Sequence, residues 1–136
     1  MTDKYDVLAE LEKMSAQVEA LAQRQAALPM PLAELMETGI AEAEALLRVM
    51  LKAERKPYAS DAELLDLWKT LVKGAPHWNT IRDNCRELIY YRNCLAAGRE
   101  DALPAQPGRM VIHTLRHIVL YLRSHAEQQD AQGDHA

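Results

Sequence analysis

Apolar side chains recur along this chain at intervals of three and four residues, which is the period of an α-helix. The first stretch shows this best, because its apolar positions follow steps of four and three, with Gln25 as the polar exception. These positions are Val7, Leu11, Met14, Val18, Leu21 and Leu28. Three heptads of this kind fit either a short coiled coil or one helix of a bundle, and both interpretations stay open.

Proline and glycine residues divide the chain into five such segments, and Ala, Leu and Glu outnumber the β-branched residues. Helices are expected over about residues 6–27, 32–54, 60–74, 77–97 and 109–126. Ser60 and Glu63 have the spacing of a capping box at the start of the third helix. Gly74 and Gly98 are expected to end the third and fourth helices. We therefore predict an all-α protein, an up-and-down bundle of four to five helices.

A chain of 136 residues has room for one domain of ordinary size. Residues 1–28 are expected to form an amphipathic helix that makes a bundle or dimer contact, residues 29–126 the remaining helices, and residues 127–136 a disordered polar tail. The sequence has no membrane-spanning run and no signal-peptide core, which predicts a cytoplasmic protein without membrane contact. Cys85 and Cys94 lie nine residues apart in one helical segment, too far to form a disulfide with each other.

The net charge of −4 is unevenly distributed, with −6 over residues 1–68 and +5 over residues 69–125. Arg109, Arg116 and Arg123 recur every seven residues, and His113 follows one turn after the first of them. These residues predict a basic stripe suited to phosphates, although an ordinary solvated helix face has the same pattern. His113 and His117 have metal-site spacing, but no third ligand lies nearby in the sequence. We expect no metal and no cofactor.

Arg92 is the residue that fits its surroundings least. It falls in the gap of an apolar stripe formed by Ile81, Cys85, Leu88 and Leu95. An arginine on such a stripe is costly unless it is paired or opens to a cleft. Two interpretations remain: the guanidinium reaches solvent or pairs with Glu42 or Glu44, or it belongs to a functional site.

The stretch from Glu87 to Gly98 resembles the signature of the HEPN family (higher eukaryote and prokaryote nucleotide-binding), small helical bundles of which many cleave RNA. The family motif is an Arg followed by a polar residue, with a His five positions after the Arg, often within Arg-Asn-x-x-Ala-His-Gly. Arg92, Asn93, Ala96 and Gly98 match this motif, and Ala97 stands where the His belongs. The resemblance covers about residues 33–125 and implies a HEPN-like bundle over residues 29–126.

The resemblance implies a metal-independent endoribonuclease of a toxin or defence system, in which two protomers face one phosphodiester groove. Its partners would be a second copy, RNA and an antitoxin or another protein. The catalytic positions would be Arg92, Asn93 and Ala97. The positions expected to bind RNA are Tyr91, Arg99, Arg109, His113, Arg116 and Arg123.

Ala97 changes what this motif can do. A histidine would act as general base on the ribose 2′-OH, and a guanidinium would stabilise the charge that develops on the phosphate. Alanine transfers no proton, so we expect little or no cleavage. The chain is then either a naturally degenerate member or an inactivated form of a nuclease. The alternative function is a non-catalytic helical adaptor that binds another protein through its N-terminal heptads and acidic half.

Overall fold

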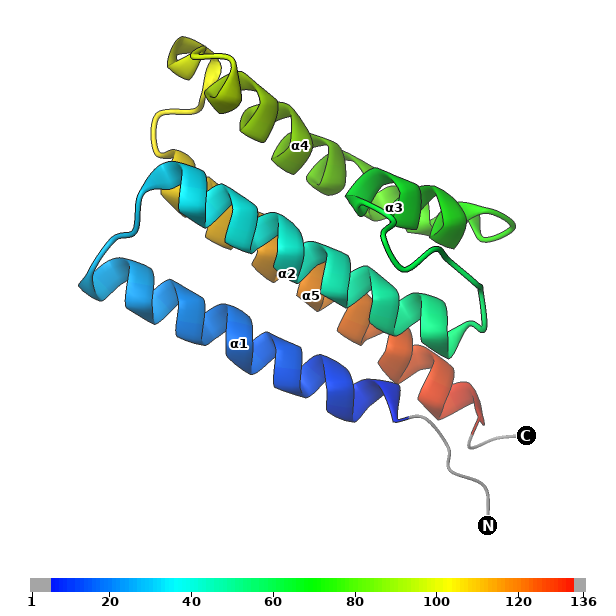
Figure 1. Cartoon of the computed structure of the whole chain (residues 1–136). Helices are drawn as coiled ribbons and strands as arrows, with labels where there is room; N and C mark the ends of the chain where they lie inside the picture. The colour runs from blue at the N-terminus through cyan, green and yellow to red at the C-terminus, as the bar shows by residue number, and fades with distance from the viewer. Residues whose placement is uncertain (1–5, 134–136) are drawn as a thin grey trace.

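The computed structural model describes residues 6–133, and this part of the chain contains helices and no strand. Four long helices run alternately up and down, and a short helix and a 3-10 turn precede the third of them at one end of the bundle (Figure 1). This confirms the predicted all-α bundle. The α-helices are α1 (Val7–Ala27), α2 (Leu32–Ala53), α3 (Leu64–Val72), α4 (Arg82–Ala96) and α5 (Pro107–Gly133), with 3-10 turns η1 (Pro76–Ile81) and η2 (Glu100–Ala102).

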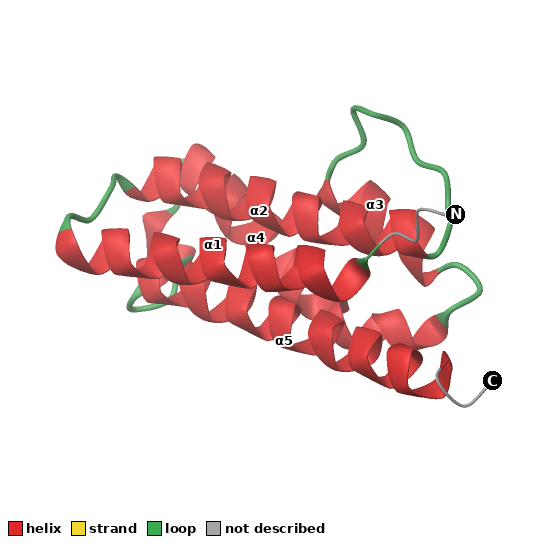
Figure 2. Ribbon diagram, turned by 90° about the horizontal axis from the view of Figure 1, so that it is seen from below, coloured by secondary structure: helices red, strands yellow, loops and turns green. Residues whose placement is uncertain are grey.

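One hydrophobic core runs through all five helices, and α1 is part of it. Leu11, Met14, Val18 and Leu21 are buried, and α1 lies against both α5 and α2 (Figure 2). The polar position of this stripe stabilises the turn after α1, because the Gln25 side chain accepts a hydrogen bond from the Met30 amide at 3.1 Å. The heptads of α1 therefore pack within the bundle of this chain.

The start of α3 differs from the prediction. The helix begins at Leu64, and its N-cap residue Glu63 makes no side-chain capping hydrogen bond, so the predicted capping box at Ser60 is wrong. The segment before α3 is held by α2 instead, because Arg48 Nη2 on α2 donates to the Ala62 carbonyl at 3.1 Å. A long-range bond of this kind has no local signal in the sequence.

The end of α5 differs as well. The helix continues to Gly133, so residues 127–133, expected to be disordered, are helical. Ala126 is buried against the core, and the residues that follow include Glu127, Gln128 and Gln129, which favour helices. Residues 134–136 of the predicted tail lie outside the described range.

Glycine ends α3 and α4 as predicted. Gly74 and Gly98 have φ values of +75° and +74°, in the left-handed region that suits glycine. Beyond α4, the Gly98 amide donates to the Leu95 carbonyl at 3.1 Å and the Arg99 amide to the Cys94 carbonyl at 2.8 Å. This is the Schellman motif, which stops the helix sharply.

The two cysteines of α4 are separate from each other. Cys85 is buried, Cys94 is half-buried, and both thiols are free, as predicted. None of the described helices combines the length and the apolar character that crossing a membrane requires.

Candidate functional site

Arg92 and Asn93 lie in the last two turns of α4, at the end of the bundle where α5 begins (Figure 1). The Arg92 side chain is half-buried, and its Nε and Nη2 donate to Asn93 Oδ1 at 3.4 and 3.3 Å in exposed hydrogen bonds. Within residues 6–133, no carboxylate lies at ion-pair distance from Arg92, so the pairing with Glu42 or Glu44, which the sequence left open, is not formed. The other alternative, a guanidinium that reaches solvent, agrees with the exposed hydrogen bonds to Asn93. The positive charge of Arg92 is held by a neutral amide and remains available to an anion.

Ala97 is the C-cap residue of α4, five positions after Arg92. Its side chain is exposed, and its amide donates to the Asn93 carbonyl at 3.0 Å. The position therefore lies at the same helix end as the Arg-Asn pair, and it has room for a larger side chain.

Two tyrosines precede Arg92 and form an edge-to-face pair with ring centroids 5.4 Å apart. Tyr91, which we predicted to bind RNA, is half-buried and packs against the core. Tyr90 is the accessible member, with 57% of its surface exposed. The sequence placed an aromatic residue beside Arg92 but did not indicate which of the two would face solvent.

Arg99 follows the end of α4, and its Nε and Nη2 donate to the two carboxylate oxygens of Asp101 at 3.1 and 3.0 Å. This hydrogen-bonded pair raises the pKa of Arg99 and lowers the pKa of Asp101. The charge of Arg99 is therefore compensated by its own loop. Its predicted contact with RNA stays a prediction.

Two arginines of the predicted basic stripe of α5 pair with α1. Arg116 donates to both carboxylate oxygens of Glu19 at 2.7 and 2.8 Å, and Arg123 donates to Glu12 at 2.5 Å. The hydrogen bond from Arg116 lowers the pKa of Glu19. Two arginines of the stripe are thus neutralised by acidic residues of α1.

The remaining residues of the stripe have weaker partners. Arg109 donates to the Gln106 side chain at 2.8 Å, and His113 is exposed. The stripe belongs to α5 and Arg92 to α4, and no hydrogen bond between the described residues joins the two. Their joint use by one RNA strand stays a prediction.

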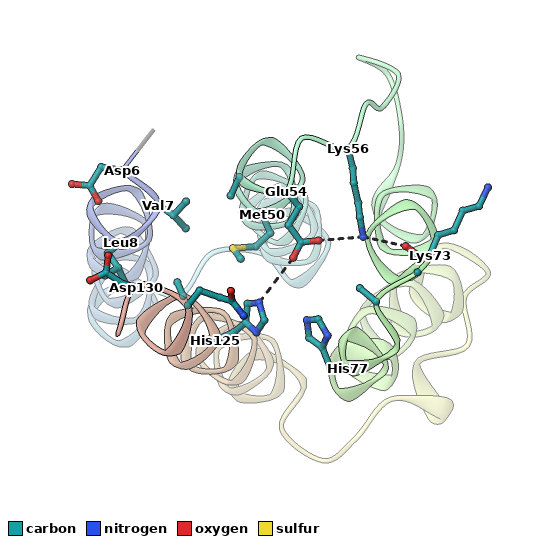
Figure 3. Close-up of a pocket in the computed structure, with 15 residues that line it drawn as sticks. Asp6, Val7, Leu8, Met50, Glu54, Lys56, Lys73, His77, His125 and Asp130 are labelled. Atoms are coloured by element: carbon teal, nitrogen blue, oxygen red, sulfur yellow. Dashed lines mark hydrogen bonds and ion pairs between the residues drawn. The ribbon is translucent and has the colours of Figure 1, made fainter. Parts of the chain in front are cut away.

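A pocket of about 880 Å³ opens at the opposite end of the bundle, where α2 ends, η1 begins and α5 approaches its C-terminus (Figure 3). Glu54, His77 and His125 point toward one another on one side of this pocket. One potential ligand atom from each residue lies within 4.8 Å of the other two. This cluster was not predicted from the sequence.

Glu54 is held by two neighbours. Its Oε1 forms an ion pair with Lys56 at 3.2 Å, and its Oε2 accepts a hydrogen bond from Trp78 Nε1 at 3.2 Å. Arg55, which lies between Glu54 and Lys56 in the chain, adopts a left-handed φ of 57°. This turn reverses the chain, so Lys56 also donates to the Leu71 carbonyl at 2.6 Å. The turn and these bonds fix the carboxylate at the wall of the pocket.

The two imidazoles stack with ring centroids 4.5 Å apart and an angle of 17° between their planes. Burial lowers the pKa of His125, the neighbouring His77 lowers it further, and Glu54 opposes both effects. His125 is therefore neutral at pH 7, with a ring nitrogen that can accept a proton or coordinate a cation.

No local pattern could have shown this cluster, because its members are separated by 23 and 48 positions in the sequence. His113 and His117, which do have metal-site spacing, are exposed on α5. Among the described residues, they gain no third ligand.

Comparisons with known proteins add no family to these observations. No family model matches the chain, and no significant match was found among curated proteins or solved structures.

Proposed function

We propose that this protein is an RNA-directed domain of the HEPN type that has lost its general base. The observation that carries the proposal is the half-buried side chain of Arg92, whose guanidinium donates to Asn93 at the end of α4 and to no carboxylate. In the described part of the chain it has no acidic partner. An arginine kept on an apolar helix face without a carboxylate is suited to an anion that comes from outside the protein.

The end of α4 also carries an aromatic ring that RNA can use. Tyr90 is exposed, and a base can stack on its ring. Residues two positions apart on a helix point in nearly opposite directions, so a strand that contacts both Tyr90 and Arg92 must pass around α4. Ala97 is exposed at the same helix end, where the resembling family carries its histidine. RNA would therefore be bound here and left uncleaved.

A second copy of the chain completes the proposal. Pairing of two protomers through the face bearing Arg92 would place two guanidinium groups along one groove, which explains why the charge is held at the end of α4. The antitoxin or other protein partner belongs to the same proposal and rests on the resemblance. The cytoplasmic location also belongs to it and rests on the lack of a membrane-spanning run and of a signal-peptide core in the sequence.

The test is RNA affinity, measured by the fluorescence anisotropy of a labelled single-stranded oligonucleotide. Arg92→Ala should weaken binding about 10-fold and make the slope of log K against log salt shallower by about 0.7 for each phosphate that the protein no longer neutralises. Arg86→Ala is the matched control, because Arg86 is an exposed arginine of the same helix. The RNA affinity of the Arg86→Ala variant should differ from that of the unaltered chain by less than about 2-fold, because Arg86 is not expected to contact a phosphate.

Equal decreases in affinity for the two variants would show that RNA responds only to the general charge of α4. No RNA binding by the unaltered chain would favour the adaptor function. The heptads of α1 could then not serve as the docking surface without opening the bundle, since they are buried in it.

A further inference from the structure

The pocket at the far end of the bundle carries a donor set that the RNA-directed function does not use. Glu54 comes from the end of α2, His77 from η1 and His125 from α5 (Figure 3). Three separate elements thus bring one carboxylate and two imidazoles together, with ligand atoms no more than 4.8 Å apart. In a tetrahedral zinc site, ligand atoms about 2.1 Å from the ion are roughly 3.4 Å from one another. To close that difference, the two imidazoles must also turn out of their stacked arrangement, because the nitrogen lone pairs of nearly parallel rings do not converge on one ion.

We infer that Glu54, His77 and His125 form a three-ligand site for a divalent transition-metal ion of the zinc class. The donor set selects the class of ion, because imidazole nitrogen suits zinc and its neighbours in the transition series. Calcium and magnesium prefer sites made of oxygen atoms only. Two histidines and one glutamate are also a ligand set that zinc uses when one coordination position stays open.

The carboxylate is positioned for one-oxygen coordination. Lys56 engages Glu54 Oε1, while Oε2 lies 4.0 Å from His125 Nε2 and accepts the Trp78 hydrogen bond. Oε2 is therefore the oxygen that faces the imidazoles. Hydrogen bonds to a ligating carboxylate orient it and are a regular part of metal sites.

The segment that carries His77 is held in place as well. Tyr121 on α5 donates its hydroxyl to the His77 carbonyl at 2.9 Å, and Trp68 Nε1 donates to the Trp78 carbonyl at 3.0 Å. These bonds tie η1 to α5 and α3. The ligand-bearing backbone is thus fixed by contacts that need no ion.

The fourth position would open into the pocket of about 880 Å³, whose wall also carries Lys73, Gln129 and Asp130. Water or a donor atom of a small molecule could occupy it. Three protein ligands and an open position distinguish this arrangement from the closed four-ligand sites that only stabilise a fold.

Aromatic packing is the competing explanation for the same cluster. The two imidazoles stack on each other, and the ring of His125 lies 4.7 Å from the Trp78 ring. Stacking would bring the histidines together without any ion. The experiment must therefore measure binding of the ion itself.

The chain, prepared without a polyhistidine tag and stripped with a chelator, is titrated with Co²⁺ and then with Zn²⁺. We expect one Co²⁺ per chain, a visible absorption band of low-symmetry Co²⁺, and disappearance of that band when Zn²⁺ displaces it. His77→Ala should weaken binding by more than about 100-fold, beyond the 10–100-fold typical of residues that only support a ligand. Since His77 is exposed, this variant should keep the fold, which circular dichroism checks.

Glu54→Gln is the second variant, because it keeps an oxygen for Trp78 and removes the charge that attracts the ion. It should also weaken Co²⁺ binding strongly. The matched control is the His113→Ala/His117→Ala double variant, which removes two exposed histidines of α5 and should bind Co²⁺ like the unaltered chain. Absence of stoichiometric binding, or equal binding by His77→Ala, would overturn the inference, and so would failure of the control to bind. None of these results depends on whether the protein binds RNA.

Discussion

Glu42 is a carboxylate on the apolar side of α2. Leu35, Leu46 and Val49 lie seven residues before it, four after it and seven after it, and all three are buried. The side chain of Glu42 is half-buried, and its Oε1 has no hydrogen-bond partner among the described residues. Burial raises the pKa of this carboxyl, because the charged form loses water that nothing replaces.

The raised pKa makes stability depend on pH in a stated direction. The folded protein keeps the Glu42 proton to a higher pH than the unfolded chain does. The contribution of this proton to the free energy of unfolding is complete below the ordinary pKa of a glutamate, and it is lost as the pH rises through the folded value. At neutral pH, the buried charge therefore destabilises the fold.

Glu42→Gln should raise the free energy of unfolding by roughly 1 kcal/mol at pH 7, at the low end for a buried unpaired group because the side chain is only half-buried. Near pH 4 the gain should shrink toward zero. Thermal unfolding at both pH values measures the difference. Glu37→Gln, which removes an exposed carboxylate from the same helix, is the control and should change little. A gain of the same size at both pH values would contradict this origin.

Single residues also show what the sequence could and could not predict. The position of Arg92 on an apolar stripe follows from helical periodicity, and the half-buried side chain agrees with it. The hydrogen-bond partner of Arg92 does not follow from periodicity. Whether a carboxylate lies closer to the guanidinium than Asn93 does depends on how the helices pack. The neighbourhoods of His77 and His125 depend entirely on tertiary contacts.

At the level of helices, the packing of α2 against α5 depends on a glycine, Gly39, which has no side chain. A Cβ atom at Gly39 would lie 2.6 Å from Val111 Cγ1, closer than two carbon atoms can pack. Val111 is fully buried, and a β-branched side chain in a helix has one strongly preferred rotamer. Gly39 is therefore required for the close approach of the two helices.

Gly39→Ala should destabilise the protein by about 1–2 kcal/mol. Overpacking in a core costs about 1–3 kcal/mol, and the better helix propensity of alanine offsets up to about 1 kcal/mol. Combining it with Val111→Ala should cost less than the sum of the two single changes, because the second change makes room for the new methyl group. Denaturant unfolding of the three variants gives this coupling. A stabilised Gly39→Ala variant would mean that α2 and α5 separate easily.

Helices were predictable where the signal is local. Apolar periodicity located all five, and Gly74 and Gly98 marked two of their ends. The start of the fourth was wrong, because Pro76–Ile81 forms a 3-10 turn and α4 begins at Arg82. Prediction failed where a long-range interaction decides the boundary. Arg48 holds the segment before α3, and the burial of Ala126 accompanies the continuation of α5.

On the scale of the whole molecule, the two candidate sites lie at opposite ends of the bundle (Figure 1). The Arg92 end has an arginine, an amide and an exposed tyrosine, while the other end has the Glu54, His77 and His125 cluster. Between them, the acidic residues of α1 neutralise arginines of α5. Anion binding is therefore expected at the Arg92 end.

The measurement that tests the RNA-directed function most directly is cleavage of single-stranded RNA by Ala97→His. Position 97 is an exposed C-cap, so the variant should fold, and it supplies the missing base at the same helix end as Arg92. We predict cleavage about 10²–10⁴-fold above the unaltered chain. It should resist EDTA, leave 2′,3′-cyclic phosphate ends and fall per chain on dilution as dimers separate. Arg92→Ala added to this variant should remove the activity, and a folded, dimeric Ala97→His protein that cleaves no RNA would contradict the proposal.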